Sequence, residues 1–239
     1  MMTLKKDCSI TWYGHSTFKI VSPKGKHILI DPWVMGNPAC PQHLKKVDRV
    51  DLILIAHGHF DHMADAVTIA RAHSPKVVGI YEVAAWLERQ GVGHTRPMNM
   101  GGTQEVDGIS VTMVQAFHSS GIQDTDGRIV YGGSAAGYVV RLENGFTFYH
   151  SGDTAVFGDM RIIAELYKPQ LCLLPIGGLF TMSPKEAAYA CKLLKPKWVI
   201  PMHFGTFPPL TGTPAQLKAL TKGIRGLNVI EMKPGDTIR

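Results

Sequence analysis

The chain has 239 residues and a formal net charge of +6, and 45% of its residues are hydrophobic and 18% charged. This composition excludes disordered and fibrous proteins. The length suits one large domain or two small ones, and because no boundary separates two domains we expect a single domain spanning residues 1–239. The longest aliphatic stretch, residues 52–56, is far shorter than the roughly 20 residues of a membrane span, and no apolar segment follows Lys5 and Lys6. We therefore expect a cytoplasmic protein without a membrane partner.

Cysteine spacing and charge distribution exclude two further classes. The four cysteines are far apart in sequence and form no C-x-x-C motif, so we expect reduced thiols rather than disulfides or a zinc knuckle. The basic residues are dispersed, which disfavours a nucleic-acid partner. The mild positive charge favours an anionic small-molecule substrate, although it serves solubility equally well. A homo-oligomer is left open.

The first half of the chain alternates strands and helices. Residues 10–20 and 27–31 are rich in β-formers and flank the turn residues 22–25, which predicts an opening hairpin. The run at 50–56 is continuously aliphatic, as in a strand that is buried on both faces. Further along, the patterns predict helices at 64–72 and 83–90 and strands at 76–80 and 109–116.

The second half repeats this organisation after a glycine-rich segment. Residues 119–137 predict a long loop that we regard as a candidate substrate loop. Ser183, Pro184 and Glu186 form a capping box that opens a helix. The other expected elements are strands at 138–142, 146–150, 171–175 and 198–202 and a helix at 160–167. Both halves together predict two sheets packed face to face with helices outside.

The segment His57-Gly58-His59-Phe60-Asp61-His62 places three imidazoles and a carboxylate directly after the buried strand. Imidazole and carboxylate groups are ligands for zinc, manganese or iron. Six positions cannot complete two metal sites, so further ligands should come from other strand ends. His118, Asp153 and His203 each follow a predicted strand. The set as a whole predicts a metal centre.

The order H-x-H-x-D-H, a lone His, a Gly-Asp and a final His resembles the metallo-β-lactamase superfamily. By that resemblance the fold is α/β, an αββα four-layer sandwich of two mixed sheets with outer helices, and the site lies at one sheet edge. The resemblance assigns His57, His59 and His118 to a first metal site, Asp61, His62 and His203 to a second, and Asp153 to a bridging position.

Within the superfamily, residues 12–16 (WYGHS), 30–32 (IDP) and 132–133 (GG) are similar to a group of small bacterial metal-dependent hydrolases without a settled substrate. The resemblance implies two divalent metal ions. Zinc is the expected metal, with manganese, iron and nickel as alternatives. Paired cations share a water and lower its pKa. We therefore expect a hydrolase whose metal-bridging hydroxide cleaves an ester, lactone or phosphodiester bond of a small anionic metabolite.

Three residues are assigned roles in addition to or outside the metal ligands. Asp61 is treated as catalytic as well as metal-binding, because its loss should empty the second site. His15, expected on a strand, is a candidate to contact substrate or protonate a leaving group, with a hydrogen-bonded core histidine as the alternative. Asp31 is expected to accept the free ring N–H of a ligand histidine, with a simple turn residue before Pro32 as the alternative.

Two other functions are kept as alternatives. One is a nuclease or phosphodiesterase acting on RNA or a nucleotide, which is weakly supported because superfamily nucleases carry RNA-binding arms or insertions. The other is a non-enzymatic, metal-dependent ligand sensor, which is disfavoured because all seven ligand positions are filled. Resemblance also disfavours true β-lactamases, which lack a carboxylate at the position of Asp153. A glyoxalase II-like thioesterase is disfavoured because residues 204–239 are too few for its helical domain.

Overall fold

The computed structural model describes residues 8–124 and 126–239. Two seven-stranded sheets carry the fold, together with one two-stranded sheet. The first large sheet contains β1 (Ser9–Gly14), β2 (Thr17–Val21), β3 (His27–Ile30), β4 (Leu52–Leu54), β5 (Lys76–Ile80), β6 (Thr95–Met98) and β16 (Thr237–Ile238). The second contains β7 (Thr103–Val106), β8 (Ile109–Gln115), β11 (Ala136–Arg141), β12 (Thr147–His150), β13 (Leu171–Pro175), β14 (Trp198–Met202) and β15 (Asn228–Val229). The small sheet pairs β9 (Gly121–Gln123) with β10 (Ile129–Tyr131).

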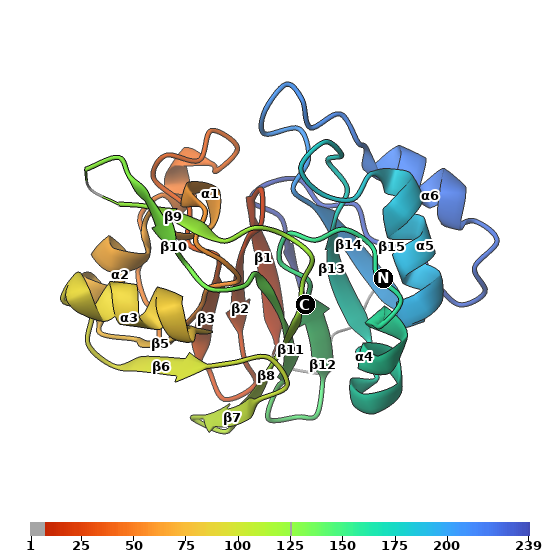
Figure 1. Ribbon diagram of the computed structural model, residues 1–239. Coiled ribbons are helices and arrows are strands. Elements are labelled where there is room, and N and C mark those ends of the chain that lie inside the picture. The colour runs from red at the N-terminus through yellow and green to blue at the C-terminus, as the bar shows by residue number, and fades with distance from the viewer. Residues whose placement is uncertain (1–7, 125) are drawn as a thin grey trace.

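Helices cover the outer faces of the two large sheets. They are α1 (Phe60–Met63), α2 (Ala66–His73), α3 (Tyr81–Arg89), α4 (Met160–Tyr167), α5 (Pro184–Leu194) and α6 (Pro214–Thr221), with a 3-10 turn at Gln42–Leu44. Figure 1 shows α2 and α3 on one side of the molecule and α4, α5 and α6 on the other, with the sheets between them. The expected four-layer sandwich is confirmed. No helix in the described part of the chain is long and apolar enough to cross a membrane.

Both large sheets are mixed in the same way. Strands β16, β1, β2 and β3 pair antiparallel, and β3, β4, β5 and β6 pair parallel. In the second sheet β7, β8, β11 and β12 pair antiparallel, and β12, β13, β14 and β15 pair parallel. Parallel neighbours need long crossovers, which here contain the helices or, between β3 and β4, the 3-10 turn. The carboxyl ends of the parallel strands therefore gather at one edge of each sheet.

Strand β13 illustrates how one sequence serves two cores. Its side chains alternate between the two faces of the sheet, as the period of two in a strand requires. Leu171 and Leu173 belong to the core between the sheets, whereas Cys172 and Leu174 pack with the outer helices. All four are completely buried. The continuous apolar run is thus explained by burial on both faces.

Several sequence predictions agree with the structure, notably the helix at 160–167 and the strands at 171–175 and 198–202. Others were wrong. The expected strand at 10–20 is broken at His15 and Ser16, so the opening unit has three strands. Gly14 has a φ of +99°, and a Cβ there would lie 2.9 Å from Ala39 Cβ, which explains the break.

The segment at 119–137 is not an extended loop, because it contains the β9–β10 hairpin and the first residues of β11. Strands β6, β7, β15 and β16 and helix α6 were missed. Pro97 obscured β6, which is an edge strand and tolerates proline for that reason. Helix α6 carries its own capping box at Thr213 and Gln216, a signal that was present in the sequence.

Candidate metal centre

Polar side chains follow the ends of six strands and meet at one edge of the sandwich. Three of these residues come directly after a strand: His15 after β1, Asp31 after β3 and His203 after β14. The other three follow their strands after a few residues: His57 after β4, His118 after β8 and Asp153 after β12. His59, Asp61 and His62 continue from His57 into α1. All nine residues singled out from the sequence therefore lie in one cluster, although they come from positions 15 to 203.

Three of these residues have a left-handed backbone conformation. His15, Asp31 and His203 have φ values of 55°, 48° and 55°. Such a conformation costs a non-glycine residue roughly 1–2 kcal/mol. Each of the three follows a strand directly, so the left-handed turn ends the strand and redirects the side chain. His15 was expected on a strand and lies instead in the turn between β1 and β2.

His57, His59 and His118 form the first group of donors. One ring nitrogen from each lies within 4.8 Å of the others. His57 Nε2 and His59 Nδ1 are 3.0 Å apart. The other nitrogen of His59, Nε2, lies 3.2 Å from Ser119 Oγ, a contact that sequence reasoning missed. The three imidazoles therefore converge on one point.

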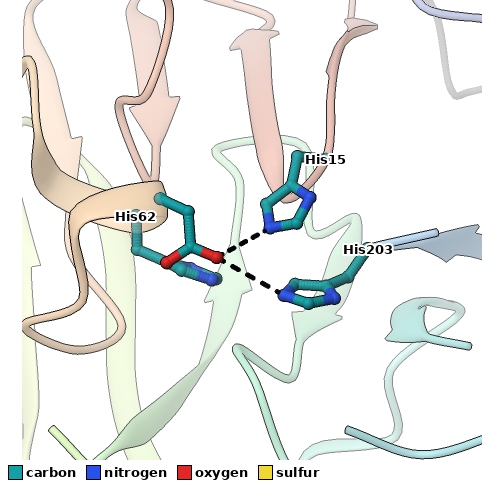
Figure 2. A group of neighbouring side chains, drawn as sticks. His15, His62 and His203 are labelled. Carbon is teal, nitrogen blue, oxygen red and sulfur yellow. Dashed lines mark hydrogen bonds and ion pairs between the residues drawn. The ribbon is translucent and has the colours of Figure 1, made fainter. Parts of the chain in front are cut away.

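Asp61, His62 and His203 form the second group, and His15 lies within the same 4.8 Å. Asp61 Oδ2 lies 3.0 Å from His15 Nε2 and 3.7 Å from His203 Nε2. Figure 2 shows His15 and His203 pointing toward the same carboxylate, with His62 behind it. The other ring nitrogen of His15, Nδ1, lies 2.9 Å from Thr206 Oγ1.

Asp153 lies between the two groups. Its Oδ2 is 2.9 Å from His203 Nε2, 3.3 Å from His62 Nε2 and 3.7 Å from His118 Nε2. These contacts are short but are not aligned as hydrogen bonds, and His62 Nε2, His203 Nε2 and Asp153 Oδ1 are buried without a hydrogen-bond partner among the described residues. Buried polar atoms normally have partners. Unsatisfied donor atoms of this chemistry, converging around a shared carboxylate, fit divalent cations.

Asp31 holds His62 in place. Its Oδ2 accepts from His62 Nδ1 at 2.8 Å, and its Oδ1 accepts from the backbone N–H of Ala56 at 2.7 Å. Both side chains are completely buried. With the proton on Nδ1 fixed in this way, His62 Nε2 is directed toward Asp153. This is the contact that the sequence interpretation expected for a carboxylate at position 31.

The pKa values separate the two groups. Burial and the neighbouring imidazoles lower the pKa of His57 well below its usual value, and burial also lowers the pKa values of His59 and His118. In the second group burial opposes protonation, but the Asp153 carboxylate outweighs it. The pKa of His203 is raised to about 9 and that of His62 well above its usual value. The first group is therefore neutral at pH 7 and the second group holds protons.

A cavity of about 760 Å³ opens onto these residues. It is lined by members of both donor groups and by three aromatic side chains: Asp61, His118, Asp153 and His203, and Phe60, Phe180 and Phe207. Sequence reasoning missed the three phenylalanines and Thr206. Phe60 occupies a variable position of the motif at residues 57–62, and the other three lie in no recognisable motif. His15 does not line the cavity and is completely buried.

Comparisons with known proteins agree with this geometry. A family model described as a beta-lactamase superfamily domain matches residues 26–204. The chain belongs to the beta-lactamase superfamily. A metal-dependent hydrolase of Koribacter versatilis is 60% identical, with 95% of this chain and 96% of that protein covered. A second metal-dependent hydrolase, from Solibacter usitatus, is 54% identical over 96% of this chain and 99% of its own.

The superfamily likeness extends to a solved structure. Igni18, a metallo hydrolase from the archaeon Ignicoccus hospitalis, has a TM-score of 0.84 at 35% identity, with 97% of each chain covered. The relatives therefore identify the chain as a metal-dependent hydrolase of the superfamily.

Proposed function

We propose that this chain binds two divalent cations and uses them to hydrolyse an ester, lactone or phosphodiester bond of a small molecule. The observation that supports this most strongly is the pair of donor groups around Asp153. They include buried atoms without a hydrogen-bond partner among the described residues, and they open into a cavity. Zinc is our first choice of metal, and manganese, iron and nickel suit the same ligands.

Each residue of the two donor groups is assigned a role in holding the cations. His57, His59 and His118 would hold one cation, Asp61, His62 and His203 the other, and Asp153 both. Cations bound in such a pair lower the pKa of water and polarise a carbonyl or phosphoryl oxygen. The neutral imidazoles of the first group offer lone pairs without losing protons. Asp31 fixes the ring of His62 so that Nε2 faces Asp153.

We assign His15 a positioning role. Burial lowers its pKa to about 4 despite the hydrogen bond to Asp61, so it is a poor proton donor near pH 7. It lies outside the cavity wall and joins Thr206 to Asp61. Its role is therefore to hold the Asp61 carboxylate. We do not assign it the contact with the substrate that the sequence interpretation had considered.

The test is metal content combined with turnover. Protein loaded with zinc or with manganese is assayed on a phosphodiester, a lactone, a thioester and a β-lactam, and its metal content is measured by mass spectrometry. We expect two cations per chain and activity on one bond type. Asp61→Ala should retain about one cation and lose turnover by orders of magnitude, whereas Glu165→Ala, an exposed carboxyl on α4, should change neither. Metal-dependent ligand binding without turnover on any substrate would instead favour a sensor.

A further inference from the structure

The walls of the cavity above the candidate metal centre are largely apolar, with Ser119 and Gln123 as uncharged polar residues. Among its described lining residues, the charged side chains apart from histidine are Asp61 and Asp153, and none is lysine or arginine. Both carboxylates belong to the donor groups and would face the cations. The basic residues behind the net charge of +6 therefore lie outside the described cavity lining. Within that lining, the bound cations would be the counter-charge for an anionic substrate group.

One wall is built from aromatic rings that are held in place from behind. Phe207 stacks on Trp33 at 5.7 Å with an interplanar angle of 25°, and Phe60 meets Trp33 edge to face, also at 5.7 Å. Trp33 is buried, whereas Phe60 remains 52% exposed. An aromatic surface fixed in this way has lost its rotamer freedom on folding, so little entropy remains to be lost when a ligand covers it.

Two further apolar side chains border the same cavity from other elements. Ile129 on β10 is 70% exposed and Phe180, which follows β13, is 59% exposed. More than half of each side chain therefore remains open to solvent. Large apolar groups that gather around a single concave site indicate a binding surface rather than scattered surface residues.

We propose that the substrate carries an uncharged apolar group, a medium-length acyl chain or an aryl ring, which binds against Phe60, Phe207, Phe180 and Ile129 while its cleavable bond lies at the metal centre. This inference rests on the proposed function and narrows its substrate class. A nucleotide or RNA substrate is disfavoured, because each additional phosphate needs cationic side chains that the wall does not provide. The small molecule is recognised by apolar burial.

The proposal is tested by binding, without turnover. Straight-chain carboxylates from acetate to octanoate, and phenylacetate, are titrated by calorimetry into zinc-loaded protein, as analogues of a hydrolysis product. Each methylene buried against the wall should tighten binding up to about fourfold, the equivalent of about 0.8 kcal/mol. Adenosine mono-, di- and triphosphate, used as the comparison series, should show no such gradient.

Variants connect the gradient to these side chains. Phe180→Ala and Ile129→Ala should flatten the dependence on chain length while the protein still binds two cations and acetate affinity stays the same. The matched controls are Tyr189→Ala on α5 and Leu166→Ala on α4, an aromatic and an aliphatic residue with 55% and 65% exposure outside this cavity. They should leave the gradient intact.

The outcomes separate this inference from the proposed function. Two bound cations with a flat carboxylate series, or with affinity that rises with each phosphate, would overturn the apolar substrate and leave the hydrolase proposal standing. A gradient that survives both cavity variants would also overturn it. Failure to bind two cations would overturn both proposals together, and the metal analysis identifies that case directly.

Discussion

Adding zinc to the metal-free protein at pH 7.5 is expected to release about two protons from side chains, both from the second donor group. The reason lies in the opposite pKa shifts of the histidines. Burial lowers the pKa of His57, His59 and His118, so these rings are already neutral. Asp153 raises the pKa of His203 to about 9 and, with Asp31, that of His62 well above its usual value.

The expected size follows from these values. A group with a pKa of about 9 is roughly 97% protonated at pH 7.5. Each of the two imidazoles must lose a proton from Nε2 before that atom can bind a cation, so affinity at the second group should rise by about 100-fold per pH unit while both remain protonated. Affinity at the first group should be nearly independent of pH over the same range.

Calorimetric titration in buffers of different ionisation enthalpy measures the proton count. Removing His203 as His203→Asn should lower the count by about one, whereas His118→Asn should leave it unchanged. Ionisation of water at a filled site adds to the count in every variant, so the differences between variants carry the test. A count that falls equally in both variants, or not at all in His203→Asn, would refute the assignment of the protons to the second group.

Three further outcomes are expected. Asp31→Asn places an amide N–H against His62 Nδ1 and should weaken zinc binding about 10- to 100-fold. The control Asp51→Asn, at a carboxylate that accepts from the backbone N–H of His27, should not weaken it. Equal zinc affinities of the two variants would contradict the role of Asp31. Burial raises the pKa of Cys8 to about 12, of Cys40 to about 11 and of Cys191 to about 12, and that of Cys172 well above its usual value. A thiol reagent at pH 8 should therefore label the folded protein slowly, and it should label all four cysteines after unfolding. Rapid labelling of the native protein would disprove this. Both Gly152 and Gly25 have positive φ, but a Cβ on Gly152 would lie 2.5 Å from Ala136 O, whereas one on Gly25 meets nothing within 4 Å. Gly152→Ala should therefore lower the free energy of unfolding in urea by about 2 kcal/mol more than Gly25→Ala. Similar losses would mean that backbone strain alone determines the cost of either substitution.

The residues of the candidate metal centre could be brought together from the sequence because they follow strands whose patterns are local. The run before His57 is continuously aliphatic and the run before His203 is continuously apolar, as parallel buried strands require. Parallel strands in turn bring their carboxyl ends to one edge, so residues that are far apart in the chain need no further signal to be placed together.

The surroundings of His15 could not be predicted in this way, because its contacts span 46 residues to Asp61 and 191 residues to Thr206. The break between β1 and β2 was also not predictable, because a stretch rich in β-formers does not show where a strand ends. This break depends on the close packing of Gly14 against Ala39. The β9–β10 hairpin was hidden for a similar reason, since its short strands lie in a glycine-rich segment. Long-range packing, rather than local propensity, determines these features.

The same long-range contacts explain how the strained backbone of the site is maintained. The carbonyl of His15 accepts from Trp12 Nε1 at 2.9 Å and from the backbone N–H of His203 at 3.1 Å, which ties two left-handed residues to each other. The carbonyl of Asp31, the third, accepts from Thr17 Oγ1 at 2.7 Å. Strain of this kind persists only where surrounding bonds determine it. Hydrogen bonds from side chains and from the backbone therefore fix these turns, so a cation entering the site meets side chains that are already oriented.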